Sequence, residues 1–227
     1  MLETTGWLPR LALAELVFFN RWGESPPPRL SEALRIEDTI EAPNAEAEDG
    51  TRAQHDRQGL VLVYTGNGKG KTTAALGLVF RALGRGLRVA VVQFIKGKWK
   101  TGERLFAAEI LNLEFHVMGR GFTWESEDLG RDRRAARDAW ARAASFIGAG
   151  EHDVVVLDEL TYCIHYGFIS LEEVLTSLRS RPTYVHVVVT GRNAPEELVA
   201  LADLVTEMRP VKHPFEHGVR AQPGIDF

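Results

Sequence analysis

The stretch from Gly59 to Leu78, GLVLVYTGNGKGKTTAALGL, constrains the fold more than any other part of the chain. A short apolar run leads into a glycine-rich turn, and the residues after the turn favour a helix. This arrangement is typical of a phosphate-binding loop, whose usual pattern is G-x-x-x-x-G-K-[ST]. Here the loop is one residue short, because Thr65 stands five positions before Gly70 and the first glycine is Gly66.

The residues of this loop are well suited to bind phosphate. Gly66, Gly68 and Gly70 let backbone N–H groups curl around an anion, and the positive end of a helix beginning near Lys71 points to the same place. Lys71 would neutralise phosphate, and the hydroxyl of Thr72 would contact Mg²⁺. An ordinary glycine-rich turn is disfavoured, because eight residues hold three glycines, two lysines and two threonines. The predicted nucleotide-binding residues are Gly66, Asn67, Gly68, Lys69, Gly70, Lys71, Thr72 and Thr73.

The lysines of the chain are concentrated near this loop. The 227 residues include 27 Lys and Arg, but only six are Lys, and five of those fall between Lys69 and Lys100. A phosphate site explains this distribution, since Lys is a compact charge that approaches phosphate oxygens. The net charge of −4 gives no indication of a bulk nucleic-acid binder. The one cysteine, Cys163, excludes an internal disulfide and fits a reducing cytosol.

The first 50 residues differ from the rest. Residues 1–59 hold eleven acidic and six basic side chains, and the apolar run WLPRLALAELVFF is too short to span a bilayer. SPPPRL interrupts the chain, and EAPNAEAEDG has the composition of a linker. We predict a poorly ordered or loosely docked extension over residues 1–50 and one domain over 51–227. A packed helix from Leu8 to Phe19 is the alternative.

From Gly59 onward, apolar runs rich in valine alternate with helical patterns. Buried strands are predicted at residues 60–66, 88–94, 113–118, 153–160 and 184–191. Helices are predicted at Lys71–Leu83, about Arg131–Ile147, Leu171–Arg179 and Ala194–Ala202, with Ser170 and Asn193 as N-caps. This alternation predicts an α/β fold, a mostly parallel sheet with helices on both faces. Together with the phosphate-binding loop, we expect a P-loop NTPase (RecA-like) architecture.

A second group of candidate site residues ends the run VVVLDEL. Four apolar residues lead into Asp158 and Glu159 at the predicted end of a strand. Nucleotide-binding folds place an acid there for Mg²⁺ or a metal-bound water. The alternative is that one of these acids caps the next helix or pairs with an arginine. Because a phosphate loop lies at the same edge of the sheet, we predict that Asp158 and Glu159 contact metal.

Several motifs occur together in one order. They are TGNGKGKTTAA, VVQFIKG, GERL, GFTWE, VVLDELTY, LEEVL, VVVTGRNAPEEL and ADLVTEMRPVKHPFEHGVRAQPGIDF. Together they resemble the P-loop-type corrinoid adenosyltransferases, which act on cob(I)alamin or cob(I)yrinic acid a,c-diamide. The resemblance covers residues 59–227 and includes the shortened loop, whereas the first 50 residues lie outside it.

The resemblance implies transfer of the 5′-deoxyadenosyl group of ATP to the cobalt of a reduced corrinoid, with release of triphosphate, in adenosylcobalamin biosynthesis or salvage. Kinases attack the γ-phosphorus, whereas this family attacks the ribose 5′ carbon. The loop would then stabilise a triphosphate leaving group with Lys69, Lys71 and Mg²⁺. The resemblance also implies Mg²⁺ or Mn²⁺ as cofactor, a reduced flavoprotein as electron donor, a homodimer and a cytoplasmic location, without nucleic-acid or membrane partners.

The resemblance also assigns roles to single residues near the nucleotide. Thr72 and Glu159 match Mg²⁺ contacts of the family, with Asp158 nearby. Arg81 matches a position that contacts the nucleotide. Lys71 matches the lysine of the phosphate-binding segment, and we predict that it is catalytic.

Two aromatic residues complete the predicted catalytic set. Phe122 and Trp124 match side chains that pack against the lower face of the corrin and displace its lower axial ligand. Loss of that ligand makes cobalt easier to reduce, and the resulting Co(I) is the nucleophile. From composition alone, aromatics on such a loop equally fit the covering of a core.

Two other classes of function remain open from the sequence. Another P-loop ATPase or a small-molecule kinase would release ADP and has no need of the GFTWE loop. A non-catalytic corrinoid or nucleotide carrier would bind ATP without turnover. We expect Cys163 to be a small buried residue and expect His213 and His217 to be structural or to face the corrin, since no further metal ligands stand near them in sequence.

Overall fold

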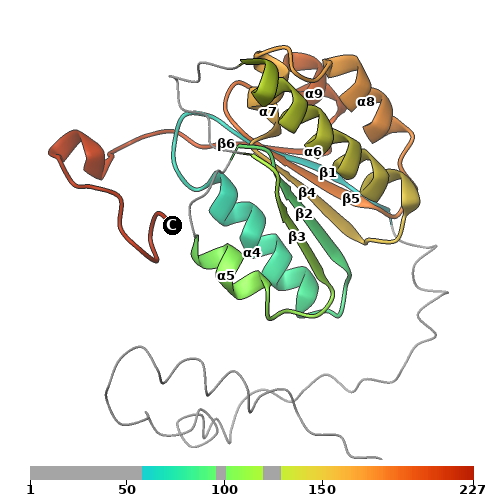
Figure 1. Ribbon diagram of the computed structural model, residues 1–227, viewed down its shortest axis with the longest axis horizontal. Helices are drawn as coiled ribbons and strands as arrows, with labels where there is room; N and C mark the ends of the chain where they lie inside the picture. Colours follow the sequence, from blue (N-terminus) through green and yellow to red (C-terminus); the bar gives the residue numbers. More distant parts are fainter. Residues whose placement is uncertain (1–57, 96–100, 120–128) are drawn as a thin grey trace, which may run out of the picture. The chain divides into compact units, whose positions relative to one another are not determined.

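The computed structural model describes residues 58–95, 101–119 and 129–227 (Figure 1). The chain divides into two units, Met1–Glu48 and Asp49–Phe227, and all described residues belong to the second. These residues form one six-stranded sheet in which every neighbouring pair is parallel, in the order β3-β2-β4-β5-β1-β6. The strands are β1 (Val61–Thr65), β2 (Val89–Gln93), β3 (Leu113–Val117), β4 (Val154–Asp158), β5 (His186–Thr190) and β6 (Leu204–Glu207).

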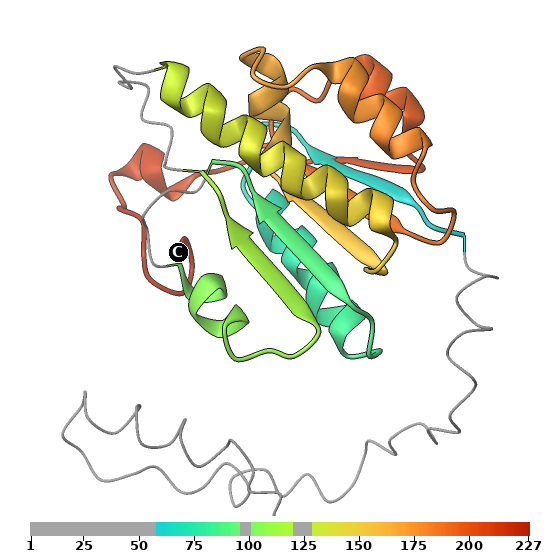
Figure 2. The ribbon, with the colours of Figure 1, turned by 45° about the vertical axis from the view of Figure 1, so that its right-hand side comes forward.

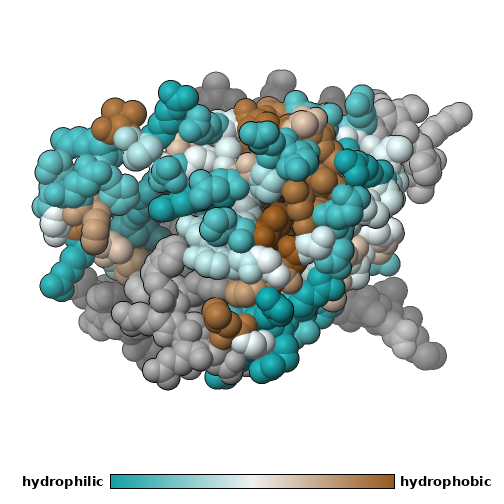
Figure 3. All heavy atoms as spheres, turned by 90° about the horizontal axis from the view of Figure 1, so that it is seen from above, coloured by the Kyte–Doolittle hydropathy of each residue, from teal (hydrophilic) through white to brown (hydrophobic). Residues whose placement is uncertain are grey.

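Helices cover both faces of the sheet, as Figures 1 and 2 show. One face carries α4 (Lys71–Leu83) and α5 (Gly102–Ala107), and the other carries α6 (Leu129–Ala149), α7 (Leu160–His165), α8 (Leu171–Arg179) and α9 (Glu196–Leu201). Polar side chains cover most of the surface seen in Figure 3, and hydrophobic ones form smaller groups. Among the described residues, no helix is both long enough and apolar enough to cross a bilayer.

The alternation of side chains along each strand builds two cores. Val61, Val63 and Leu157 point to the face under α6 to α9, whereas Val156 and Val188 point to the face under α4. Because both faces are covered, the central strands are almost continuously apolar. The predicted parallel α/β fold is therefore confirmed.

Most of the predicted elements are present, with some different ends. The bounds of α4 and α8 agree with the prediction, and Ser170 forms the expected capping box, in which its N–H donates to Oε2 of Glu173 over 3.2 Å. The assignment of Asn193 as an N-cap is wrong. Asn193 has a φ of 52°, which is left-handed, and α9 begins three residues later at Glu196, with Pro195 as its N-cap.

Four short elements were not predicted from the sequence. They are α5, α7, β6 and the 3₁₀ helix η1 (Pro214–His217), each of four to six residues. A segment of this length is too short to display a helical period, and all four residues of β6 are exposed at the edge of the sheet. The signals that were used for the longer elements are therefore absent from these segments.

The strand order brings the predicted site residues together. Strand β5 lies between β1 and β4, and all three run in the same direction. Their carboxyl ends therefore place the glycine-rich loop, Thr190 and Asp158 at one edge of the sheet. Ligands of open α/β sheets bind at this edge.

Candidate active site

The glycine-rich loop is a tight turn between β1 and α4. Gly66 and Gly70 have positive φ values of 92° and 110°. Residues other than glycine rarely adopt such values. The N–H of Gly68 donates to the carbonyl oxygen of Met208 over 2.7 Å. A Cβ atom at Gly68 would lie 2.8 Å from that oxygen, and one at Gly66 would overlap it. The close passage of Met208 explains why the loop needs its glycines.

Lys71 folds back over this loop. Its Nζ donates to the carbonyl oxygens of Gly66 over 2.9 Å and Gly68 over 2.6 Å, and only 6% of the residue is exposed. An ammonium has three N–H donors, so these two bonds fix the group and leave one donor for a phosphate oxygen. Burial lowers the pKa of Lys71, and the charge of Arg192 lowers it further, although Glu159 and Asp158 act in the opposite direction.

Asp158 connects three strands and the loop. The carboxylate is buried, and its Oδ1 accepts hydrogen bonds from the hydroxyls of Thr72 over 2.9 Å and Thr190 over 2.7 Å. Its Oδ2 accepts from Nε2 of Gln93 over 3.0 Å. Asp158 therefore orients the hydroxyl of Thr72 at the start of α4.

Glu159 follows Asp158 in an unusual backbone conformation. Its φ of 63° and ψ of 27° are left-handed, and such strain in a non-glycine residue persists where the surroundings hold it. Its N–H donates to Oγ1 of Thr190 over 2.9 Å. This backbone bend places Glu159 on the wall of the cavity beside the loop.

A cavity of about 610 Å³ opens beside the loop. The predicted residues on its wall are Asn67, Gly68, Lys69, Gly70, Lys71, Thr72, Thr73 and Glu159. Residues that the sequence analysis did not select complete the wall, and these are Leu76, Gly102, Glu103, Phe106, Tyr162, Arg192, Gly224, Ile225, Asp226 and Phe227. The structure thus joins cationic, acidic and aromatic side chains from five separate stretches of sequence.

Comparison with known proteins identifies the family. The sequence model of the ATP:corrinoid adenosyltransferases BtuR/CobO/CobP matches residues 57–227. The chain belongs to this family. The resemblance drawn from its motifs is confirmed.

Curated relatives agree with this assignment. The corrinoid adenosyltransferase of Escherichia coli K12 is 45% identical over 193 residues, which cover 85% of this chain and 94% of that protein. The corrinoid adenosyltransferase CobA of Salmonella typhimurium shows the same identity and coverage. The corrinoid adenosyltransferase of Pseudomonas aeruginosa is 44% identical over 194 residues, or 85% of this chain and 96% of that protein.

The alignments to these relatives are longer than the family match. Residues 57–227 make up about three quarters of the chain, whereas the alignments cover 85% of it. Of the 227 residues, 193 are aligned, so at most 34 are left uncovered. The similarity therefore continues before residue 57 and includes part of residues 1–50, which we had expected to lie outside it. Among solved structures, a match to the flagellar accessory protein FlaH of Methanocaldococcus jannaschii covers 71% of this chain and 77% of that protein, at a TM-score of 0.46 and 12% identity.

Arg192 is a cavity residue that the sequence analysis missed. It follows Gly191, whose φ of 140° and closeness to Thr161 exclude a side chain. Oγ1 of Thr161 donates to the carbonyl oxygen of Arg192 over 2.6 Å and fixes this turn. The signal in the sequence was an arginine two residues after the strand VVVT, because β5 ends at the same edge as the loop.

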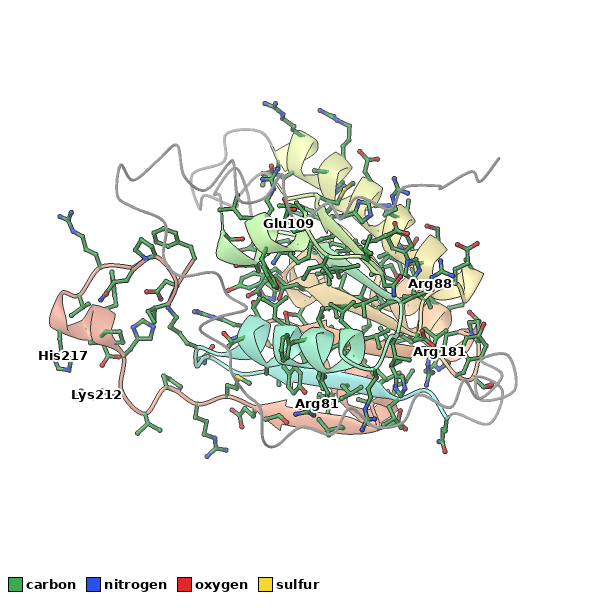
Figure 4. The ribbon with its side chains drawn as sticks, turned by 90° about the horizontal axis from the view of Figure 1, so that it is seen from below. Arg81, Arg88, Glu109, Arg181, Lys212 and His217 are labelled. Atoms are coloured by element: carbon green, nitrogen blue, oxygen red, sulfur yellow. The ribbon has the colours of Figure 1, made fainter. Side chains whose placement is uncertain are left out.

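The other predicted site residues lie in different places. Arg81 is exposed in the last turn of α4, ten residues and therefore about 15 Å along the helix from Lys71. Figure 4 shows it toward the end of α4 that is far from the segment carrying Lys212 and His217. Arg81 does not line the cavity, so contact with the nucleotide remains a proposal. Phe122 and Trp124 lie outside the described residues.

The prediction that Cys163 is a buried residue is confirmed, and His213 makes a structural contact. Cys163 is fully buried, and burial, aided by the charge of Glu159, raises the pKa of its thiol to about 12. His213 caps η1 by accepting the N–H of Phe215 at Nδ1 over 3.2 Å. Within the described ranges, no group of three or more His, Cys, Asp or Glu side chains could hold a metal ion.

Proposed function

We propose that this protein transfers the 5′-deoxyadenosyl group of ATP to the cobalt of a reduced corrinoid and releases inorganic triphosphate. Membership of the ATP:corrinoid adenosyltransferase family supports this reaction. The observation in the structure that supports it most directly is the buried Lys71, whose Nζ is fixed by two loop carbonyls on the wall of the cavity. A site of this kind holds a polyphosphate.

In this reaction the corrinoid cobalt is the nucleophile. Co(I) donates an electron pair to the 5′ carbon of ATP, a cobalt–carbon bond forms, and the bond between that carbon and its oxygen breaks. The electron pair of the broken bond leaves with triphosphate, and cobalt becomes formally Co(III). Because no proton moves in this step, the site needs no general base.

The protein contributes to this step by stabilising the leaving group. Negative charge grows on the oxygen that departs from the 5′ carbon, and cationic groups and oriented N–H donors lower the energy of that charge. Lys71, Lys69 and the backbone N–H groups at the start of α4 supply positive charge at the loop. Arg192 adds a further cation to the wall of the same cavity.

We also propose that ATP binds as its Mg²⁺ complex, or with Mn²⁺ in its place. Thr72 and Glu159 would hold the ion, and Asp158 would orient the hydroxyl of Thr72. The donor set fits Mg²⁺, which binds one or two carboxylates and completes its shell with phosphates and water. When bound, the ion would neutralise charge on the triphosphate.

The partners form a further part of the proposal. A reduced flavoprotein would supply the electron that converts Co(II) to Co(I), and the protein would work as a homodimer in the cytoplasm. A reducing compartment suits both Co(I) and the single cysteine. Which corrinoid is used, cobalamin, cobinamide or cobyrinic acid diamide, is decided by comparing the three in one assay.

The experiment supplies chemically reduced cobalamin and ATP and measures two products. We expect the absorption spectrum of an alkylated cobalt and one inorganic triphosphate per corrinoid. Release of ADP would instead indicate a kinase or ATPase. Binding of both substrates without any product would indicate a carrier.

A further inference from the structure

The last described residues of the chain contact the phosphate loop. Asp226 forms an ion pair with Nζ of Lys69 through its Oδ1. Its Oδ2 accepts the N–H of Gln222 over 2.8 Å, and its own N–H donates to the carbonyl oxygen of Gln222 over 2.8 Å. We refer to residues 222–227 as the C-terminal turn.

The C-terminal turn forms one wall of the cavity beside the loop. Gly224, Ile225, Asp226 and Phe227 all line it, as do Lys71 and Thr72. The carboxylate of Asp226 is largely covered, with 15% of its side chain exposed, whereas Lys69 is about half exposed. The carboxylate of Asp226 therefore lies in the cavity where the anionic triphosphate is expected to bind.

We infer that Asp226 is an internal counterion that competes with triphosphate for Lys69 and so speeds the release of this product. A triphosphate carries several negative charges, and placing them beside Asp226 costs energy through repulsion of like charges. Binding of ATP therefore requires Lys69 to exchange the carboxylate for phosphate oxygens, and product release reverses this exchange.

The competitor is effective because it is part of the same chain. A tethered group acts at an effective concentration in the millimolar range or above, and the hydrogen bonds to Gln222 hold the carboxylate in position. After the reaction, the loop keeps its cations around a free triphosphate, which would otherwise leave slowly. Asp226 touches Lys69 and not the reacting atoms, so it is a positioning residue.

The test measures binding of inorganic triphosphate to the full chain by calorimetry, without corrinoid. We expect Asp226→Asn to bind triphosphate about two- to fivefold more tightly, the range of one partly exposed ion pair. Asn can still accept the N–H of Gln222, so the turn is kept. Asp226→Glu, which keeps the charge, should lie close to the parent chain.

Two further variants distinguish the ion pair between Asp226 and Lys69 from a general repulsion of triphosphate by negative charge. When Lys69 is also replaced by Ala, Asp226→Asn should increase the affinity for triphosphate by a smaller factor, because the cation for which Asp226 and triphosphate compete is absent. An equal gain in both backgrounds would overturn the inference and leave only general repulsion. Glu216→Gln removes one negative charge from the exposed helix η1, and a gain as large as that of Asp226→Asn would overturn the inference too.

A kinetic and a dynamic readout complete the test. Stopped-flow measurement should show slower triphosphate release from Asp226→Asn, and unchanged or faster release contradicts the inference. Hydrogen exchange at the N–H of Asp226 should become faster when triphosphate binds. Slower exchange would mean that the C-terminal turn becomes more ordered instead of being displaced from Lys69, which would contradict the inference.

The inference rests on the proposed function only in taking triphosphate as the product. If the parent chain released ADP, the proposed function would fail, while the binding cycle would still measure the competition for Lys69. If adenosyl transfer occurred and Asp226→Asn bound triphosphate no more tightly, the inference alone would fail.

Discussion

The hydroxyl of Thr190 donates to Oδ1 of Asp158 over 2.7 Å and also accepts the N–H of Glu159 over 2.9 Å. One side chain on β5 thereby fixes both acids that follow β4. Thr190 and Asp158 are each almost fully buried, so these bonds have no water to replace them. Thr190 controls the geometry of the two acids at the loop, although it does not line the cavity itself.

We expect Thr190→Val to lower the free energy of unfolding by about 1–3 kcal/mol, because the substitution leaves a buried carboxylate oxygen and a partly buried N–H without this partner. Urea unfolding measures the change. Thr190→Ser keeps the hydroxyl, so its free energy of unfolding should fall by less. If Val and Ser were equally stable, the hydrogen bonds of Thr190 would contribute nothing.

The phosphate loop and the acids could be predicted because each is a continuous stretch of sequence. The loop is recognised by its glycines and Lys71, and Asp158 by the apolar run before it. Thr190 and Gln93 reach Asp158 only because β5 and β2 are the neighbours of β4. That neighbourhood is a property of strand order, which no local pattern specifies.

The same limit applies to the residues from the end of the chain. Asp226 lies 157 positions after Lys69, and nothing in the local sequence around either residue indicates that they pair. Edge strand β6 was missed because its four residues are all exposed and show no alternation. Long buried strands were found because their valines must be covered on both faces.

The second prediction concerns Lys71→Ala. The ammonium holds two loop carbonyls and would contact phosphate, so its loss should weaken ATP binding and slow adenosyl transfer by about a hundredfold or more, as for other removed groups that stabilise developing charge. Steady-state kinetics with reduced cobalamin measure the effect.

Lys69→Ala is the matched control for this variant. Lys69 is about half exposed and paired with Asp226, so its removal should cost less than that of Lys71. Near-normal kinetics for Lys71→Ala would remove the phosphate-loop assignment.

The third prediction follows from the pKa of Lys71. Burial lowers this pKa below its usual value of 10.5, and Arg192 acts in the same direction. In the free protein the ammonium therefore loses its proton at a lower pH than an exposed lysine, and affinity for ATP should fall as pH rises through that lowered pKa. Calorimetric titrations over an alkaline pH series measure this loss.

Lys71→Arg provides the comparison. A guanidinium remains charged throughout this pH range, so the variant, although weaker at neutral pH, should not show the same loss. Parallel pH profiles for the parent and the Arg variant would assign the loss to another group.

The fourth prediction concerns residues 1–50. Their acidic charge and their prolines predict that they are dispensable, although the alignments to the curated relatives include part of them. A chain beginning near Asp49 should fold and keep its activity. Because similarity to the curated relatives continues before residue 57, a chain beginning near Gln58 should be made in parallel.

Circular dichroism and the adenosylation assay test both truncations. Activity that is lost only in the shorter chain would place the needed residues between 49 and 57. An insoluble or inactive chain from Asp49 would contradict the prediction and make the extension part of the core or of a dimer.

The fifth prediction separates two roles of Phe122 and Trp124. If these aromatics only cover a core, replacing both with Ala should lower the free energy of unfolding by several kcal/mol, and activity per folded molecule should survive. If they displace the lower axial ligand of the corrin, stability should change little. Thermal unfolding in the absence of substrates distinguishes these outcomes.

The dependence on the cobalt state tests the ligand displacement itself. With cobalt reduced chemically to Co(I), much of the rate of the double variant should remain, because that species already lacks a strong lower ligand. With Co(II) and a mild biological reductant, the rate should collapse. Magnetic resonance of the Co(II) complex with ATP should show a four-coordinate signal in the parent and none in the variant. Equal losses with both cobalt states would reject displacement and leave only general binding of the corrin.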